Sequence, residues 1–219
     1  LLKKSFLRDG GTLLIGHRVM NIFKEQNSNF FNINVIDRRK NLVGMNASDV
    51  VFSLPPQSLL NLIPIDGGLS TTYRESINEL PKPSGAVVFY GAISRSDLPV
   101  DCPGHIQIFD EHFGSLFISI SMEDDQRAPA GIATLIASIF VDIDQWSNLE
   151  SQSYRSKKNI VANQILTTIN NKLNLRETSW MHQELSTPRS FERWTGRPGG
   201  IVGGLGQHPT QFGPFGLPS

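Results

Sequence analysis

Residues 85–93, with the sequence GAVVFYGAI, decide the fold class of this chain. The stretch is rich in β-branched and aromatic residues, which are enriched in strands. Three later stretches, residues 105–109, 115–121 and 132–141, have the same character, and each is bounded by Gly, Pro or Asp. Four strands of this kind predict a broad mixed or antiparallel sheet.

A change of hydrophobic period follows these strands. Over residues 150–173 one helical face carries Tyr154, Val161, Ile165, Ile169 and Leu173. A second helix is expected to begin at Thr187-Pro188, because threonine caps a helix and proline suits the first helical position. Phe191 and Trp194 would share one face of that helix. Strands combined with these helices predict an α+β fold.

The residues before a boundary expected near Asp66 have the pattern of a small antiparallel sheet with short helices. Residues 1–7 look like the end of an amphipathic helix, and Gly10-Gly11 would end it. The run Asp37-Arg38-Arg39-Lys40 is expected to form a solvated turn between two strands. We expect strands at residues 12–15, 17–23, 31–36 and 49–54, and helices at 57–62 and 71–80.

The composition argues against several classes of function. The 20 basic and 20 acidic residues cancel. Proteins that bind nucleic acid carry a basic stripe that neutralises phosphates, so no nucleic acid is expected as a partner. The single cysteine, Cys102, cannot form an internal disulfide, which argues against a secreted, disulfide-stabilised domain. The longest apolar run, residues 131–141, is about eleven residues long and too short to span a bilayer.

One cluster of side chains suggests a metal site. It contains His105, Asp110, Glu111 and His112, whose spacing is not that of a zinc site. The residues flank an alternating strand and a turn, so the favoured interpretation is the polar edge of a hairpin. No metal is expected.

Two further candidates for chemistry have simpler explanations. Asp124 and Asp125 are an acidic pair that could serve acid–base chemistry, although a solvated loop is favoured. Cys102 could be a nucleophile, but it lies between Asp101 and Pro103 with no helix start to lower its pKa. The sequence also lacks a Gly-x-Ser-x-Gly elbow and a phosphate-binding loop. The chemistry therefore does not follow from an obvious set of side chains.

The end of the chain, TPRSFERWTGRPGGIVGGLGQHPTQFGPFGL at residues 187–217, is dense in glycine and proline. A flexible linker has this composition too. Here, however, the glycines alternate with Trp194, Ile201, Val202 and two phenylalanines, and the Ser and Glu repeats of a solvated linker are missing. We therefore expect an ordered glycine-rich wall, whose backbone can closely approach a ligand.

Short motifs follow one another along nearly the whole chain. The earlier ones are Gly10-Gly11-Thr12-Leu13, Arg18-Val19-x-x-Ile22, Ala47-x-Asp49-Val50-Val51 and Leu54-Pro55-Pro56-Gln57-Ser58-Leu59-Leu60. The later ones are Lys82-Pro83-Ser84-Gly85-Ala86, Gly114-Ser115-Leu116-Phe117-Ile118-Ser119, Asp125-x-x-Ala128-Pro129-x-Gly131 and TPRSFERWTGR at 187–197. In order and spacing they resemble the FAD-dependent carotenoid desaturase and isomerase family of the flavin amine oxidase superfamily. The closing Gly203-Gly204-x-Gly206-Gln207 and Phe212-Gly213-Pro214-Phe215-Gly216 are most similar to bacterial and cyanobacterial carotenoid C-3',4' desaturases.

The resemblance implies an FAD-dependent desaturase, in which a hydride moves from a polyene to the flavin and loss of a neighbouring proton leaves a C=C bond. Val19 matches the family residue whose backbone faces the adenine. Ser53 and Pro55 match the strand end beside the nucleotide. Gly203 and Gly204 match the glycine-rich approach to the isoalloxazine and the substrate tunnel. Ordinary strand and turn structure is the alternative for all five, and the catalytic residues stay unknown.

Four charged residues near the second helix have two interpretations. Arg189, Glu192, Arg193 and Arg197 would form surface salt bridges at a helix end, each contributing little to stability. The alternative implied by the resemblance is a position beside the flavin or the mouth of the tunnel.

The resemblance divides the chain into three parts. Residues 1–65 would be a partial FAD-binding domain, 66–194 a substrate-binding domain, and 195–219 a glycine-rich return towards the flavin. The family's amino-terminal Rossmann fingerprint and carboxy-terminal Gly-Asp segment are not in the sequence, and the chain does not begin with Met. We therefore expect a fragment that alone holds FAD weakly and is inactive.

The expected partners are a carotenoid or other long apolar polyene and the membrane surface from which it comes, for a cytoplasmic, peripheral membrane protein. Alternatives within the family are a carotenoid cis-trans isomerase and a retinoid saturase. A non-catalytic lipid-binding protein is the rival from another class. An amine oxidase is disfavoured because the end of the chain lacks paired aromatics that would flank an amine.

Overall fold

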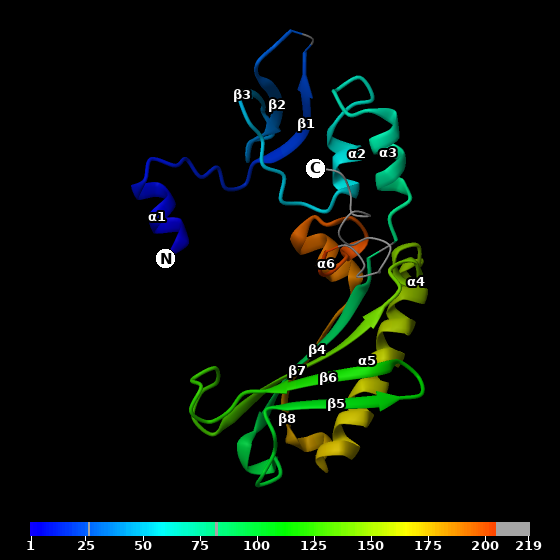
Figure 1. The fold of residues 1–219 in the computed structure, drawn as a ribbon. Coiled ribbons are helices and arrows are strands. Elements are labelled where there is room, and N and C mark those ends of the chain that lie inside the picture. The colour runs from blue at the N-terminus through cyan, green and yellow to red at the C-terminus, as the bar shows by residue number, and fades with distance from the viewer. Residues whose placement is uncertain (26, 82, 205–219) are drawn as a thin grey trace, which may run out of the picture. The chain divides into compact units, whose positions relative to one another are not determined.

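The computed structural model describes residues 1–25, 27–81 and 83–204. These residues form two compact units, Leu1–Leu80 and residues 81–204 (Figure 1). The boundary expected near residue 66 falls inside the first unit, before helix α3 (Thr71–Asn78). Both units combine helices with antiparallel sheets, so the α+β prediction is confirmed.

The first unit is built on a three-stranded antiparallel sheet. Its strands, in the spatial order β1-β2-β3, are β1 (Arg18–Lys24), β2 (Phe31–Ile36) and β3 (Leu42–Ala47). Ile33 pairs with Ile22 on one side and with Met45 on the other, and Ile22 and Val35 are buried. Helix α1 (Leu2–Arg8) precedes the sheet, and α2 (Gln57–Leu62), which contacts β1, follows it.

The turn between β2 and β3 confirms the interpretation of the basic run at residues 37–40. Asp37 Oδ1 accepts hydrogen bonds from the backbone N–H groups of Arg39 and Asn41, each at 2.8 Å. Lys40 adopts a positive φ of 66° in this turn. These hydrogen bonds, the strongest from Asn41, lower the pKa of Asp37.

Two of the four strand predictions for this unit were wrong. Residues 12–15 and 49–54 are not strands, whereas residues 42–47, which the sequence did not single out, form β3. Leu14, Ile15 and Val51 are exposed in the structure. Their apolar character therefore does not reflect pairing within a sheet.

The second unit contains a five-stranded antiparallel sheet in the order β5-β6-β7-β4-β8. Its strands are β4 (Gly85–Ser94), β5 (His105–Asp110), β6 (Gly114–Ile120), β7 (Ile132–Val141) and β8 (Trp180–Ser186). The four predicted strands are confirmed, and β8 was not foreseen. Its helices are α4 (Asp144–Ser147), α5 (Ser151–Leu173) and α6 (Pro188–Thr195), and single 3₁₀ turns occur at Arg95–Asp97, Glu177–Ser179 and Pro198–Gly200.

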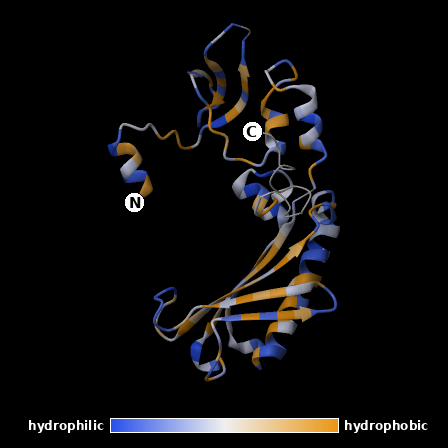
Figure 2. Ribbon diagram, viewed as in Figure 1, coloured by the Kyte–Doolittle hydropathy of each residue, from blue (hydrophilic) through white to orange (hydrophobic). Residues whose placement is uncertain are grey.

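Helix α5 packs against one face of this sheet and forms the main core. Its Ile165, Ile169 and Leu173 are buried, as the helical period predicted. The buried sheet residues beneath them alternate along the strands and include Val87, Phe89, Ile93, Leu116, Ile118, Leu135 and Ile139. Figure 2 shows apolar residues along these strands. Full burial of each such side chain contributes about 1.5–3 kcal/mol.

Helix α6 begins where the sequence placed a helix start. Thr187 is its N-cap, Pro188 is its first residue, and Ser190 Oγ accepts a hydrogen bond from the Thr187 backbone N–H at 3.2 Å. Gly196 ends the helix in the left-handed conformation with φ of 70°. Within the described ranges, no helix is long and apolar enough to cross a membrane.

Candidate functional site

The face of the five-stranded sheet opposite α5 carries a set of exposed apolar side chains. Phe140 on β7 is 75% exposed and Phe109 on β5 is 87% exposed. Phe117 on β6 and Ile136 on β7 are each about two-fifths exposed. We call these four residues the apolar face. Exposed apolar patches of this kind mark binding surfaces more often than isolated apolar residues do.

The strand register shows how the apolar face is arranged. Ile136 lies opposite Tyr90 of β4 on one side and opposite Ser119 of β6 on the other. Phe117 lies opposite Ser138, and Phe140 opposite Ala86. Phe117 and Phe140 therefore each have a small residue opposite them, whereas Ile136 lies between Tyr90 and Ser119. An elongated apolar ligand could lie between the large side chains.

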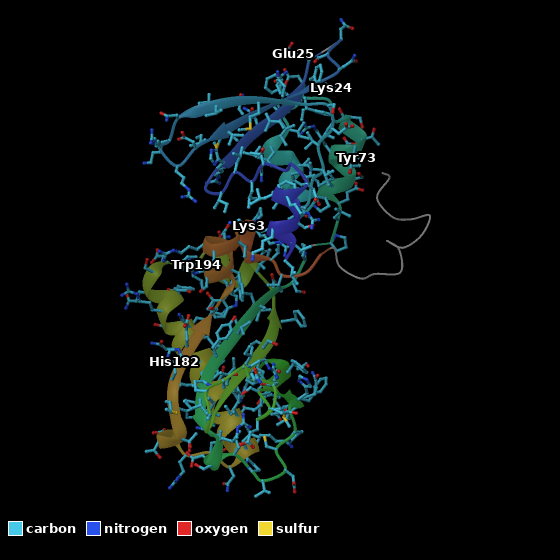
Figure 3. The ribbon with its side chains drawn as sticks, turned by 90° about the vertical axis from the view of Figure 1, so that its left-hand side faces the viewer. Lys3, Lys24, Glu25, Tyr73, His182 and Trp194 are labelled. Atoms are coloured by element: carbon cyan, nitrogen blue, oxygen red, sulfur yellow. The ribbon has the colours of Figure 1, made fainter. Side chains whose placement is uncertain are left out.

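Polar groups border the apolar face on the β8 side. Tyr90 lies between Ile136 and Glu184 in the register, and burial, together with the Glu184 charge, raises the pKa of the Tyr90 hydroxyl. His182 Nε2 lies 3.9 Å from Glu184 Oε2, and both residues belong to β8, on which Figure 3 labels His182. On the β5 side, the His105 ring stacks on Phe117 with centroids 5.6 Å apart.

The described part of the glycine-rich return, residues 195–204, passes one end of this sheet, whereas its expected continuation and closing motifs at residues 205–219 lie outside the described residues. Ile201 forms an antiparallel bridge with Gly85, and the Val202 N–H donates a hydrogen bond to the Ser84 carbonyl at 3.0 Å. Gly85 is the first residue of β4 and lies beside Ala86, whose partner is Phe140. The segment is thus at the same end of the sheet as Phe140.

The predicted cofactor residues lie in both units. Gly203, with φ of 75°, and Gly204 are exposed at the end of the described chain in the second unit. In the first unit, Val19 lies on β1, and Ser53 and Pro55 precede α2. Ser53 is exposed and Pro55 is buried. The role of these five residues in binding FAD is a prediction from the resemblance.

The surroundings of Val19 are compatible with a planar, hydrogen-bonding ligand. β1 is an edge strand of the described sheet, and its register is interrupted between Val19 and Asn21. Among the described residues, Asn21 Oδ1 and Gln57 Oε1 are buried and have no hydrogen-bond partner. Buried acceptors without a partner are costly, so a donor from a ligand or another part of the protein would stabilise them. These features fit the nucleotide part of FAD.

The four charged residues near α6 do not form the surface salt bridges that were favoured. Arg189 donates hydrogen bonds to backbone carbonyls, and the Arg193 guanidinium lies over the Trp194 ring at 5.6 Å. Glu192 and Arg197 bind the backbone of the glycine-rich segment. Within residues 83–204, none of the four takes part in an ion pair. Backbone groups are available as partners here because two helix ends and a glycine turn lie close by.

The acidic and histidine cluster at residues 105–112 belongs to a hairpin, as favoured. Strands β5 and β6 pair from His105–Ser119 to Asp110–Gly114. Asp110 Oδ1 accepts from the His112 N–H at 2.8 Å, and Oδ2 accepts from Thr168 Oγ1 at 3.1 Å. In the described part of the chain, no three His, Cys, Asp or Glu side chains are grouped as metal ligands.

The contacts of Asp125 and Cys102 do not favour the acid–base and nucleophilic roles considered for them from the sequence. Asp125 accepts hydrogen bonds from the Arg127 side chain and from the backbone N–H groups of Arg127 and Met122, which hold its pKa at about 2. Cys102 lines a pocket of about 360 Å³ with Arg95 and Met122. Burial raises the pKa of the Cys102 thiol, which disfavours the nucleophilic thiolate.

Comparison with known proteins gives partial similarities. No protein-family model matches the chain. The chloroplastic prolycopene isomerase of Daucus carota is 31% identical over 134 residues, which are 57% of this chain and 22% of that protein. Prolycopene isomerase 2 of an Oncidium hybrid cultivar is 30% identical over 116 residues, covering 48% and 20%. The Arabidopsis thaliana prolycopene isomerase is 32% identical over 111 residues, covering 50% and 18%.

The chain is a distant relative of prolycopene isomerases. It spans about a fifth of the length of these curated relatives. The similarity supports the resemblance to carotenoid-modifying enzymes at the level of the family. The finer expectation of a C-3',4' desaturase stays a prediction.

Sequence reasoning did not find the polar border of the apolar face. Glu184 and His182 lie on β8, whose residues are mostly exposed and show no clean alternation. Tyr90 was recognised only as part of a strand. The sequence could have indicated its place, because Tyr90 directly follows the buried Phe89 in β4 and neighbouring residues of a strand lie on opposite faces of the sheet.

Proposed function

We propose that this chain is part of an FAD-dependent desaturase that acts on a carotenoid or another long apolar polyene. The observation that carries the proposal is the apolar face, which extends along the sheet to the end where Ile201 pairs with Gly85. A polyene lying on Phe117, Ile136 and Phe140 would reach the beginning of the glycine-rich segment. The similarity to prolycopene isomerases supports the same class of substrate.

FAD would be held by the residues that the resemblance assigns, namely Val19, Ser53, Pro55, Gly203 and Gly204. When bound, FAD would accept a hydride from a saturated C–H of the polyene, while the neighbouring carbon loses a proton and a C=C bond forms. The unpaired Asn21 and Gln57 oxygens in the first unit can accept hydrogen bonds from the nucleotide part. The exposed Gly203 and Gly204 leave the backbone accessible.

The chain's own residues would bind the polyene and exclude water from it. Contact with the apolar face removes about half of an isoleucine or phenylalanine side chain from water at each position, which contributes about 1 kcal/mol each. Because its pKa is raised, the Tyr90 hydroxyl stays neutral and places no charge beside the polyene. These residues would therefore orient the polyene and keep water away from it.

A substrate this apolar would be drawn from a lipid phase. We therefore propose that the complete protein is cytoplasmic and peripheral to a membrane surface. Flotation of the complete gene product with lipid vesicles tests this part. A protein that stays at the bottom of the gradient with vesicles of neutral and anionic composition would overturn it.

Isomerisation is the second candidate reaction. The similarity to prolycopene isomerases of Daucus carota, Oncidium and Arabidopsis thaliana favours it. It needs the same binding of an elongated polyene but leaves the number of double bonds unchanged. The closing motifs of the chain favour desaturation instead.

The experiment that tests the proposal uses the complete gene product, purified with FAD and supplied with lycopene-type and hydroxylated carotenoids. Chromatography with absorption detection separates the outcomes. A red-shifted product supports desaturation, and changed retention with an unchanged chromophore length supports isomerisation. A purified protein without the visible absorption band of oxidised flavin overturns the enzyme proposal and favours a non-catalytic lipid-binding protein.

A further inference from the structure

Three of the five residues from Gly199 to Gly203 have a backbone conformation that only glycine adopts easily. Gly199, Gly200 and Gly203 have φ angles of 65°, 68° and 75°. Glycine also loses the most conformational freedom on folding, so a segment with three of them needs contacts to keep one conformation. Its fixed shape must therefore come from neighbouring groups.

Backbone contacts hold the middle of this segment. The Gly200 N–H donates to the Arg197 carbonyl at 2.9 Å, and the Val202 N–H donates to the Ser84 carbonyl at 3.0 Å. Gly200 is buried, and a Cβ there would lie 1.8 Å from the Pro188 carbonyl oxygen. The middle of the segment is thus fixed against β4 and α6.

Two charged side chains hold its ends. Glu192 Oε1 accepts a hydrogen bond from the Gly199 N–H at 3.0 Å. Arg197 Nη2 donates to the Gly203 carbonyl at 2.5 Å. Hydrogen bonds that involve a charged group are stronger than neutral ones. Glu192 and Arg197 therefore fix the first and the last glycine of the segment.

We infer that Glu192 and Arg197 are positioning residues that set the path of the glycine-rich segment as it leaves the sheet. Arg197 acts on Gly203, one of the two glycines that the proposed function places beside the flavin. The inference rests on that proposed function. Its consequence is that the two side chains control how the Gly203–Gly204 backbone meets the flavin, and hence the flavin's spectrum and potential.

The test uses the complete gene product with FAD and two pairs of variants. Glu192→Ala removes the acceptor, whereas Glu192→Gln keeps an amide oxygen in its place. Arg197→Met removes the donor, whereas Arg197→Lys keeps one. Arg155→Met is the matched control, because Arg155 is an exposed arginine of the same unit and lies on α5. Two readouts are needed: hydrogen exchange of the amides in residues 196–204, and the absorption spectrum and reduction potential of the bound flavin.

We expect amide exchange in this segment to become about tenfold faster in Glu192→Ala and Arg197→Met, with smaller changes in Glu192→Gln and Arg197→Lys. The flavin spectrum and potential should shift in Glu192→Ala and Arg197→Met and stay unchanged in Arg155→Met. Faster exchange with an unchanged flavin would overturn the positioning role and leave a purely structural one. Unchanged exchange would overturn the inference as well. A wild-type protein without flavin overturns the proposed function itself, which the spectrum reveals before any variant is made.

Discussion

The Arg189 guanidinium lies over the Tyr154 ring, 4.5 Å from its centroid. The Tyr154 hydroxyl is in turn 2.8 Å from Thr187 Oγ1 at the start of α6. Arg189 also donates hydrogen bonds to backbone carbonyls at the end of α4, which belong to Trp146, Ser147 and Leu149. One side chain thus connects α4, α5 and α6. Within the motif at residues 187–197, Arg189 therefore has a structural role.

Replacing Arg189 by methionine should destabilise the protein by about 3 kcal/mol. The variant keeps an apolar stem but leaves partly buried carbonyls at the end of α4 without a donor. Urea unfolding followed by tryptophan fluorescence, which reports Trp146, measures the change. Arg193→Met is the control and should change stability by less than about 0.5 kcal/mol. Equal effects of the two substitutions would contradict the role assigned to Arg189.

Replacing Gly200 by alanine should destabilise the protein by about 3 kcal/mol or more. The new Cβ would collide with the Pro188 carbonyl, and the positive φ adds backbone strain. Gly204→Ala is the matched control, because no atom of the described residues lies within 4 Å of a Cβ at that position. Thermal unfolding of both variants checks this. A Gly200→Ala protein as stable as the control would show that the segment does not pack against Pro188.

Replacing Ile136 by serine should weaken polyene binding about fivefold to tenfold. The substitution removes part of the apolar face without opening the core, so the affinity falls by about 1 kcal/mol while stability is nearly kept. Ile160→Ser on α5 is the control, because Ile160 is similarly exposed away from the sheet. Titration of the complete gene product with a carotenoid, followed by absorption, compares the two. An equal loss in both variants would count against the apolar face.

Asp125 should titrate with a pKa of about 2, against an ordinary value of 3.8. Because the folded-state pKa lies below the unfolded value, the stabilisation is complete above pH 3.8 and is lost as the pH falls towards 2. Arg127→Met should raise the pKa of Asp125 towards 3.8, although the backbone hydrogen bonds from Met122 and residue 127 remain. NMR titration of the carboxyl carbon measures it, with Arg155→Met as the control. A pKa that does not move in Arg127→Met would contradict the assigned cause.

The sequence allowed prediction of those elements whose burial follows a simple period. Strand β7 alternates buried and exposed residues, and α5 places Ile165, Ile169 and Leu173 on one face, so both were found nearly to the residue. The start of α6 was predicted because the rule for Thr-Pro is local. Such signals do not depend on distant parts of the chain.

Elements held by backbone pairing rather than by burial were missed. Along β8 only Leu185 is buried, and the strand exists because its backbone pairs with the inner strand β4. In β3, Gly44 and Asn46 weaken the strand pattern, yet both residues pair with β2. Conversely, the apolar residues at 12–15 have no strand beside them in the described chain.

The candidate site also has one part that the sequence indicates and another part that depends on the folded chain. The resemblance pointed to Gly203 and Gly204, but the hydrogen bonds that Glu192 and Arg197 make to their segment depend on the folded path of the chain. The apolar face requires knowledge of the strand pairing, because Phe117 on β6 is brought beside Ile136 and Phe140 on β7 by the pairing of these two strands. Neither relationship can be derived from spacing along the sequence.

The hydrogen bond from the Val202 N–H to the Ser84 carbonyl means that the second unit begins and ends at the same point in space. A unit closed in this way is a cassette. It can be exchanged between related proteins, or removed and replaced by a short linker, without stretching the chain on either side. A circular permutation that joins residues near 84 and 202 therefore needs only a short connection.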